Sequence, residues 1–324
     1  MAETTTTLSP NLHSYYQKRL LEGAKKMFKF RQFGDEKLHP KGTGKDYFLL
    51  RYGHVNPSTN TLTEGVTPSA TTVDTNKYTV SINEYGQYIE YSQLLQWTAI
   101  DDVQNSLVDE LSYTAAHSLD QVIRDHLIAN ATTNIKYVGS GNTADNDITA
   151  SETFTAPDVL KSVSLLSGAD VRPFDDDNYI WLIHPYIGID IMSDTSAGGF
   201  IELNKYVQGM KATEIYNGEI GKVYGARVVT STDVSFAANA GSVNVYRTFV
   251  MGKNAYQMTK FNNDAIELIV KKPGSAGTAD PLNQKGTCGY KIQFGVKYTG
   301  GSFTNHNGAS PDTVLQLRGT STNN

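Results

Sequence analysis

The sequence predicts a mixed α+β fold, and three patterns along its 324 residues carry that prediction. Residues 101–129 repeat apolar side chains at helical spacing. Residues 78–91 alternate apolar and polar side chains, as half-buried strands do. Residues 179–183 form a short apolar run that is typical of a fully buried strand. Mixed elements without an internal repeat indicate one large domain or two smaller ones, each with a real core.

The composition limits the class of protein. With 39% hydrophobic and 19% charged residues, the chain is globular rather than disordered. No run approaches the roughly 20 apolar residues of a membrane-spanning helix, and residues 1–10 lack the apolar core of a signal peptide. The only cysteine, Cys288, cannot form an intramolecular disulfide and is expected to be a small core residue. Nothing directs the chain to a membrane or to export.

The charge is distributed unevenly along the chain. Residues 1–52 hold ten Lys or Arg against five Asp or Glu, a net of +5, so the remainder must carry −10 to give the total of −5. A basic first segment on an acidic body could face nucleic acid or the acidic surface of a neighbouring copy. Ordinary solvated lysines explain the same pattern, so the residues alone leave these alternatives open.

The first hundred residues predict an arm and a hairpin. A short amphipathic helix begins near Asn11 and ends before Gly34, with Leu12, Tyr16 and Leu20 at helical spacing. A strand over residues 47–52 and another from Tyr78 bracket a polar segment, and a bulge or bend at Gly86 would explain a change of phase in the second strand. Because an isolated two-stranded hairpin is marginally stable in water, we expect it to lie on a partner.

The remaining elements build the body. Asp101 is a plausible N-cap of a helix about 40 Å long that runs to residue 129. Its apolar stripe comprises Val103, Leu107, Leu111, Ala115, Leu119, Val122 and Leu127. Beyond the loop 139–142 we predict a helix after Thr155, a buried strand over 179–183 and a helix from Pro185. Further strands are expected over residues 226–230, 243–251, 266–270 and 290–298. The segment 300–324 is polar, although Val314, Leu315 and Leu317 could dock somewhere.

Two glycine-rich segments resemble a phosphate-binding loop, but neither fits. That motif needs Ser or Thr directly after its lysine and a glycine five residues before it. Asp46 and His39 occupy these positions around Lys45, and Val223 and Tyr216 occupy them around Lys222. We therefore predict no nucleotide site.

Other candidates for chemistry are isolated. Asp175, Asp176 and Asp177 could attract a hard cation, but three consecutive acids converge on one ion only with strong loop curvature, so a solvated loop is favoured. His184 ends an apolar strand without a nucleophile or an orienting acid placed beside it by the sequence. His117 and His126 are nine residues apart, which is not the spacing of paired zinc ligands on a helix.

The basic and aromatic residues of segment 25–31 suit stacking on nucleic acid or an arm with an apolar side equally well. We predict no catalytic residue, cofactor or metal site, and this profile favours a structural or interaction protein over an enzyme.

Several short sequence motifs, which follow one another in a fixed order, allow a more specific prediction of the protein family. They include Leu62-Thr63-Glu64-Gly65-Val66-Thr67-Pro68, Tyr85-Gly86-Gln87-Tyr88-Ile89-Glu90-Tyr91-Ser92 and Tyr216-Asn217-Gly218-Glu219-Ile220-Gly221, with further phrases at 8–22, 98–101, 123–125, 183–185, 225–229 and 274–284. Over residues 8–298 this closely resembles the major capsid protein family of tailed bacteriophages, in the branch of the N-four-type podophages and related prophages.

The resemblance implies the Hong Kong 97-type coat fold. It assigns residues 1–45 to an N-terminal arm, 46–93 to an extended E-loop hairpin and its base, and 94–154 to a peripheral (P) domain with the spine helix. Residues 155–261 would form the axial (A) domain, and 262–299 would return to the P-domain in strands. The polar tail 300–324 departs from the family pattern.

The same resemblance implies a subunit that assembles into hexamers and pentamers of an icosahedral virion shell around double-stranded DNA. Its partners would be portal and scaffolding proteins and a decoration protein, and assembly would take place in the bacterial cytoplasm. We expect scaffolding to come from a separate protein and this chain not to be trimmed. Residues 55–77 are expected to act as a clasp between subunits. A nanocompartment shell of the same fold and a hydrolase using His184 and the cluster Asp175 to Asp177 are the alternatives.

Overall fold

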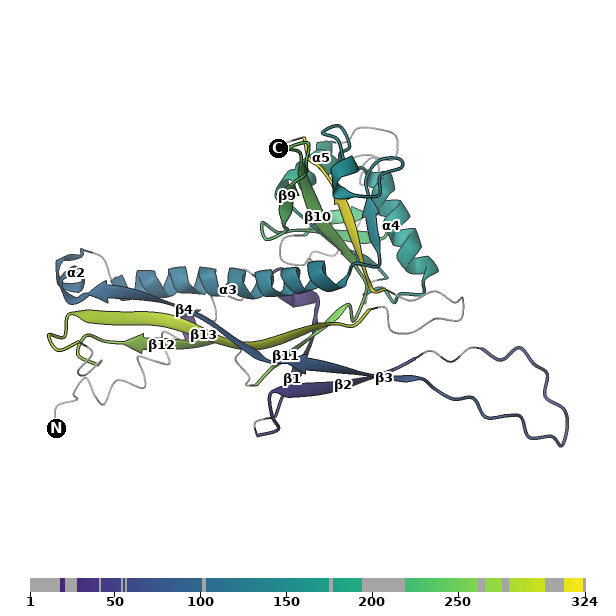
Figure 1. Cartoon of the computed structure of the whole chain (residues 1–324), viewed down its shortest axis with the longest axis horizontal. Coiled ribbons are helices and arrows are strands. Elements are labelled where there is room, and N and C mark those ends of the chain that lie inside the picture. The colour runs from purple at the N-terminus through teal and green to yellow at the C-terminus, as the bar shows by residue number, and fades with distance from the viewer. Residues whose placement is uncertain are drawn as a thin grey trace.

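Two large β-sheets, a long helix that connects them and a separate two-stranded sheet make up the described part of the fold in this computed structural model (Figure 1). The structure describes residues 18–20, 28–40, 42–53, 55, 57–100, 103–174, 177–193, 219–261, 266–275, 280–300 and 312–322. The long helix, α3, lies along the first sheet, the second sheet is stacked beyond its C-terminal end, and a thin hairpin extends away from both.

Helix α3 spans Val103–Asn130 and confirms the predicted helix to within two residues at each end. The expected N-cap, Asp101, lies outside the described residues. Leu111, Ala115, Leu119 and Leu127 are buried as predicted, whereas Val103, Leu107 and Val122 are only partly buried. The buried face also includes Val108 and Ile123, because the helix packs against the first sheet on one side and the N-terminal segment on the other.

The first sheet has the strand order β1 (Asp35–Leu38), β11 (Tyr256–Lys260), β13 (Lys285–Tyr298) and β12 (Ile266–Lys271), with β4 (Asn83–Ser92) also paired to β13. The predicted strands at 266–270 and 290–298 are confirmed, although β13 begins five residues earlier. Cys288 is 3% exposed within this sheet, which confirms its predicted place in the core.

The predicted bulge at Gly86 is wrong. Strand β4 pairs with β13 without a register shift from Asn83 to Ser92. The change of phase lies instead at Ile82, where the chain leaves β3 (Thr75–Ser81) and enters the first sheet. Gly86 is needed for close approach, because a Cβ there would lie 2.7 Å from the Tyr290 carbonyl oxygen.

The predicted hairpin is confirmed. Strand β2 (Asp46–Tyr52) pairs with β3 in an antiparallel sheet of its own. Two hydrogen bonds attach its inner side to the body, from Arg51 Nη1 and the Tyr78 hydroxyl to the Thr299 carbonyl oxygen at 2.6 and 3.2 Å. The loop beyond the strands projects from the end of the molecule opposite to the short helix α2 (Gln93–Thr98) (Figure 1).

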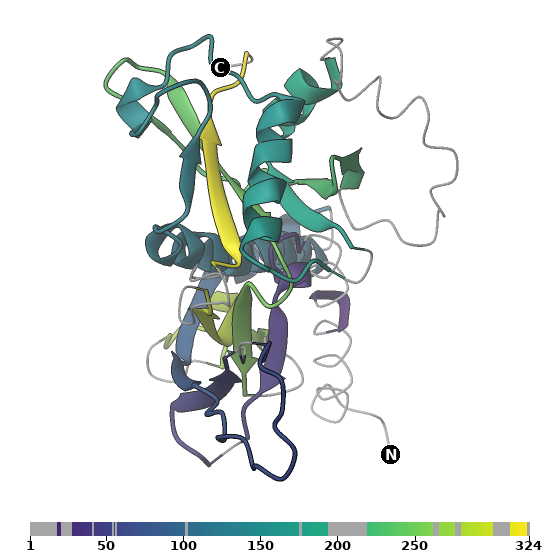
Figure 2. The same ribbon diagram turned by 90° about the vertical axis from the view of Figure 1, so that its right-hand side faces the viewer.

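The second sheet has the order β5 (Ile135–Tyr137), β14 (Val314–Gly319), β10 (Asn244–Met251), β6 (Tyr179–Ile183), β8 (Ala226–Thr230) and β7 (Glu219–Val223), and β9 (Phe236–Ala238) also pairs with β10. Strands β6 and β8 have the predicted bounds, and β6 is buried throughout. Helix α4 (Ala156–Gly168) packs across β14 and β7 (Figure 2). Helix α5 (Pro185–Ser193) follows β6 as predicted.

Helix α4 begins where the sequence predicts, because Thr155 and Asp158 form a capping box. The Thr155 backbone N–H and hydroxyl donate to Asp158 Oδ2 at 3.2 and 2.6 Å.

The connection before α4 contains a 3₁₀ turn, η2 (Asp145–Asp147), and a charged cluster. In this cluster Arg318 Nη1 contacts both Asp145 carboxylate oxygens, at 2.8 and 2.9 Å.

The segment expected to be a polar tail contributes an inner strand to the second sheet. Val314 and Leu315 are fully buried in β14, and Leu317 is 2% exposed. Gln316 is also fully buried, and its amide donates to the Ala131 carbonyl at 2.8 Å, just beyond α3. Its polar side chain therefore has a partner in the core, which the composition of the segment does not reveal.

We expect Leu315→Ala to lower the free energy of unfolding of the unassembled subunit by about 2 to 5 kcal/mol, because it leaves a cavity in the core. Leu282→Ala is the matched control, since Leu282 is 73% exposed, and its effect should stay within about 0.5 kcal/mol. Urea unfolding measures both. Equal effects for the two variants would mean that β14 is not part of the folded body.

Candidate interaction surfaces

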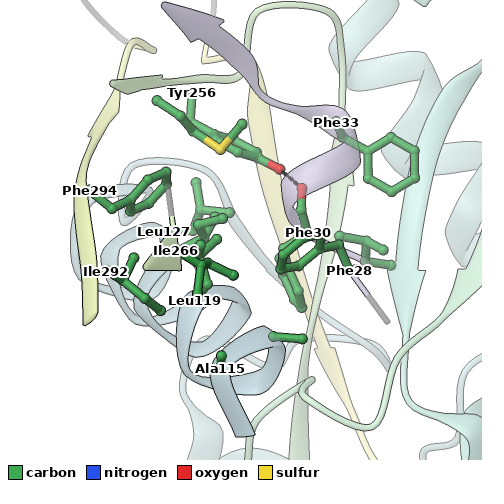
Figure 3. Packing of buried hydrophobic residues seen from close by; sticks show 14 of the residues in the cluster. Phe28, Phe30, Phe33, Ala115, Leu119, Leu127, Tyr256, Ile266, Ile292 and Phe294 are labelled. Carbon is green, nitrogen blue, oxygen red and sulfur yellow. Dashed lines mark hydrogen bonds between the residues drawn. The ribbon is translucent and has the colours of Figure 1, made fainter. Parts of the chain in front are cut away.

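The N-terminal segment is fixed to α3 by one buried carboxylate. Asp120 is 1% exposed and accepts hydrogen bonds from three successive backbone N–H groups, of Lys29 at 2.6 Å, Phe30 at 3.2 Å and Arg31 at 3.2 Å. Burial raises the pKa of Asp120 to about 6, and the nearby Asp233 carboxylate acts in the same direction, against the lowering effect of the three donors. The Tyr256 hydroxyl donates to the Phe30 carbonyl (Figure 3).

This anchor narrows the predicted end of the N-terminal helix, which the sequence placed before Gly34. Residues 18–20 are helical, but residues 28–30 are not, and a 3₁₀ turn, η1, spans Arg31–Phe33. The N–H groups that would continue a helix are bonded to Asp120 instead. The helix therefore ends before Phe28, and its exact end lies outside the described residues.

The aromatic residues of the basic N-terminal run are core residues. Phe28, Phe30 and Phe33 are each at most 8% exposed and pack with α3 and the sheets, as Figure 3 shows. Arg31 pairs with Glu36 at 3.1 Å, and Arg19 contacts both Asp109 oxygens at 2.6 and 2.8 Å. Residues 25–27 lie outside the described part of the chain. The described part of this run is a packing segment and not a stacking platform for bases.

The hairpin has an exposed apolar face. Alternate residues of β2 point away from the body, and Phe48, Leu50 and Tyr52 are 54%, 66% and 66% exposed. Lys77 Nζ lies 3.7 Å from the centroid of the Phe48 ring across the pair of strands. Apolar side chains on the open face of a two-stranded sheet are typical of a surface that another chain covers.

The loop of the hairpin is exposed throughout residues 57–74. Its apolar side chains Leu62, Val66 and Val73 are 77%, 64% and 48% exposed. Leu62 and Val66 flank a tight turn, in which the Val66 N–H donates to the Thr63 carbonyl at 3.2 Å and Gly65 adopts a φ of 79°. The Gly53 N–H donates to the Asp74 carbonyl at 2.8 Å and closes the strand ladder at the base of the loop.

A second apolar surface, the tip patch, lies at the other end of the molecule. It comprises Leu94, Leu95, Trp97, Ile100 and Leu282, which are 47% to 102% exposed. Helix α2 carries three of them and has no buried residue, although Ser92 Oγ caps it by accepting from the Leu95 N–H at 3.1 Å. So short a helix is not stable through its backbone alone. This patch could not be predicted from the sequence, because apolar residues in a short helix are usually core residues.

Neither glycine-rich segment forms a phosphate loop. Gly42 and Gly44, with φ of 86° and 98°, lie in the turn between β1 and β2, where His39 Nε2 and the Gly44 carbonyl oxygen are 3.0 Å apart. Gly218 lies outside the described residues, and Lys222 is within β7. Both lysines therefore belong to turn and strand structure, whereas phosphate loops lead into a helix N-terminus.

The residues of the hydrolase alternative do not assemble into a described site. The His184 ring packs against the rings of Tyr186, Phe236 and Tyr246, and its Nδ1 accepts from the Tyr186 N–H at 3.3 Å. Burial lowers the pKa of His184. Asp175 and Asp176 lie outside the described residues, and Asp177 sits in a turn with a φ of 55°.

The two helix histidines have separate structural partners. His117 Nδ1 lies 2.7 Å from Asp233 Oδ1, and this contact connects α3 to the loop after β8. His126 Nε2 accepts from the Tyr298 N–H at 3.1 Å, and burial lowers the pKa of His126. Within the described ranges, no group of three or more His, Cys, Asp or Glu side chains could hold a metal ion, and no helix is long and apolar enough to cross a membrane.

Within the described part of the chain, an exposed hairpin lies at one end of the elongated body and an exposed apolar patch lies at the other, as expected of a subunit that associates with other chains. The architecture is the Hong Kong 97-type coat fold. Solved structures with the same fold include the capsid of Ralstonia phage GP4, with a TM-score of 0.72 and 12% identity over 91% of this chain and 92% of that one. The capsid of cyanophage Pam1 matches with a TM-score of 0.63 and 16% identity over 88% and 87%. The head of Helicobacter pylori bacteriophage KHP40 matches at 0.63 and 13% over 88% of each chain.

The family follows from the sequence profile, because residues 76–297 match that of the phage capsid proteins. The chain belongs to the phage capsid protein family. It is therefore a structural protein of the virion and not an enzyme. A search of curated protein sequences gave no significant match.

Proposed function

We propose that this chain is the subunit that self-assembles into hexamers and pentamers of an icosahedral shell around double-stranded DNA. The observation that carries the proposal is the β2–β3 hairpin, whose apolar outer face and 57–74 loop have no covering partner among the described residues. A hairpin of this kind gains stability when it lies across a neighbour. Symmetry then repeats each weak contact many times over a closed assembly.

The observed elements support an assignment of the parts. We assign β2, β3 and their loop to the E-loop, and α3 with the first sheet to the P-domain. The second sheet with α4 and α5 would be the A-domain. Because β14 pairs with β10 in the second sheet and β11 pairs with β13 in the first, we propose that β14 belongs to the A-domain and β11 to the P-domain, with the boundary near Met251 instead of residue 261.

The partners proposed from the resemblance are portal, scaffolding and decoration proteins and packaged DNA, with assembly in the bacterial cytoplasm. Contact with DNA would be electrostatic and independent of base sequence. The ion pairs of Arg19 with Asp109, Arg31 with Glu36 and Lys37 with Asp35 already use three of the N-terminal cations within the chain. Lys45, together with the basic residues Lys25, Lys26 and Lys41 that lie outside the described part of the chain, is the candidate for this contact.

Sedimentation and negative-stain electron microscopy of the protein purified from its native source test the proposal. We expect uniform icosahedral particles of megadalton mass that contain DNA. Particles filled with protein instead of DNA would indicate a nanocompartment shell. A small soluble oligomer would overturn the proposal.

The tip patch gives an optical prediction for assembly. Trp97 is 74% exposed, whereas Trp181 is fully buried and donates from Nε1 to Thr248 Oγ1 at 3.1 Å. We expect acrylamide to quench Trp97 strongly in the free subunit and only weakly in shells, with emission moving to shorter wavelength. Trp181→Phe should keep this change and Trp97→Phe should abolish it. Equal quenching of Trp97 in shells and free subunits would show that the patch stays uncovered.

A further inference from the structure

The open face of the first sheet contains a hollow of about 400 Å³ whose lining includes Gly86, Tyr88, Ile269, Lys271, Thr287 and Gly289. Gly289 pairs with Ile269 on one side and with Tyr88 on the other. Because side chains of such a row stand on the same face of a sheet, Tyr88 and Ile269 form two walls and the glycine leaves the space between them empty. Both walls are solvent-accessible, at 66% and 39% exposure.

The charges around this hollow are distinctive. Two neighbouring lysines of β13 are neutralised across the sheet, Lys285 by Glu90 at 3.4 Å and Lys291 by Glu84 at 2.9 Å. Lys271 lines the hollow and has no ion pair with any described residue. Among the described residues, the hollow therefore offers apolar walls and, at its edge, one positive charge without an ion pair.

The turn at residues 62–66 of the hairpin loop is complementary to this hollow in apolar surface and in charge. Leu62 and Val66 present apolar side chains on either side of the turn. Glu64 lies between them and is the only Asp, Glu, Lys or Arg in the sequence between Arg51 and Asp74. Glu64 is exposed and has no ion pair within the described part of the chain. The turn thus carries two apolar groups and one negative charge in a stretch of five residues.

The loop of one molecule does not lie near its own hollow. The hollow is lined by β4, β12 and β13 and lies toward the α2 end of the molecule, whereas the loop projects from the opposite end (Figure 1). Any occupant supplied by this loop must come from a second copy. Such a head-to-tail contact joins two different surfaces, so its repetition closes into a ring when the rotation between copies permits.

We propose that the turn 62–66 of one copy docks in the hollow of the next, with Leu62 and Val66 between Tyr88 and Ile269 and with Glu64 paired to Lys271. The proposal rests on the assembly function proposed above, and it names the hollow on the first sheet of the neighbouring copy as the surface that the hairpin loop contacts. Burial of two aliphatic side chains provides the attraction, and the single charge pair fixes the register of the contact.

Charge reversal tests the pairing in the full-length chain. We expect Glu64→Lys and Lys271→Glu each to lower the yield of assembled shells at least about tenfold at low salt, and the double variant to restore most of it. Glu110→Lys and Lys136→Glu are matched controls, because both residues are exposed on other elements, α3 and β5. Their shells should form at the parental yield. Circular dichroism of each unassembled variant establishes that it is folded.

A covalent probe gives an independent readout. In the variant with both Val66→Cys and Ile269→Cys, oxidation of assembled shells should give a ladder of disulfide-linked copies on a non-reducing gel. Each single cysteine variant should remain monomeric, because the native Cys288 is buried. A substitution that fills the hollow at Gly289 is unsuitable, since a Cβ there would lie 2.7 Å from the Tyr88 Cβ.

The outcomes separate the two proposals. Single reversals that assemble like the parent, or a double variant that fails as badly as the singles, would overturn the Glu64–Lys271 pairing while shell formation by the parent upholds the assembly function. Absence of the disulfide ladder in shells would overturn the seat itself. Failure of the parent chain to form shells under any condition would remove the assembly function and this inference with it.

Discussion

Replacing residues 54–73 by an Asn-Gly turn is expected to prevent closed shells from forming while leaving the subunit folded. The Gly53 to Asp74 hydrogen bond closes the β2–β3 ladder at 2.8 Å, so a two-residue turn can join the strands there without changing their register. The excised loop is exposed throughout its described residues and contributes no buried side chain. Losing about 1.4 kcal/mol at each contact lowers its association constant about tenfold, and a shell multiplies that loss over all its subunits.

Sedimentation of the assembled fraction measures the effect, and thermal unfolding of the free subunit shows that its fold is retained. Substituting Ser69 and Thr71 by Ala is the matched control, because it changes exposed loop residues without shortening the loop. Shells of normal yield and stability from the shortened chain would rule out a clasp role for residues 55–77.

Replacing Asp120 by alanine should lower the free energy of unfolding of the subunit by roughly 3 to 5 kcal/mol. The substitution removes the acceptor of three backbone N–H groups and leaves a void beside α3. The N-terminal segment should detach first, because Lys29, Phe30 and Arg31 are held by this carboxylate. Hydrogen exchange of these three amides, together with urea unfolding, would report both effects.

Asp125→Ala is the control for this substitution on the same helix. Its carboxylate is 65% exposed and pairs only with the adjacent Arg124 among the described contacts, at 2.7 Å. Its loss should change stability by less than about 1 kcal/mol. If Asp120→Ala were no more destabilising than Asp125→Ala, the buried carboxylate would not anchor the segment.

The same carboxylate predicts a pH dependence with a definite sign. Burial raises the pKa of Asp120 from 3.8 to about 6, so the folded state holds this proton more tightly than the unfolded state does. The stabilisation that comes from proton binding to Asp120 is therefore complete below about pH 4 and is lost as the pH rises through about 6. The change amounts to about 3 kcal/mol. The hydrogen bonds that this carboxylate accepts from three backbone N–H groups are a separate contribution, which Asp120→Ala removes.

Comparison with Asp120→Asn isolates this contribution, because the other groups that titrate nearby are common to both proteins. The free energy of unfolding of the parent relative to Asp120→Asn should be largest at pH 4 and smaller at pH 7. A difference that is independent of pH between these limits would contradict the raised pKa.

The sequence alone determined the helices and strands whose pattern of apolar residues lies within one continuous segment of the chain. The long helix, the buried strand 179–183 and the strand 226–230 appear with bounds within two residues of those predicted. The hairpin was also predictable, because two strand patterns enclose a segment too polar to form a core. The order of the family phrases identified the class of protein, which the matching profile over residues 76–297 confirms.

Only the tertiary structure decided which partner covers each surface. Periodicity shows that a residue is buried but not what buries it, so it could not place β14 beside β10 or assign Asp120 to the N-terminal segment. It also placed the change of phase at Gly86 instead of Ile82, because the switch from one sheet to another is a long-range event. The tip patch was missed for the same reason: its apolar residues have no cover within the described chain, and only the folded arrangement reveals that.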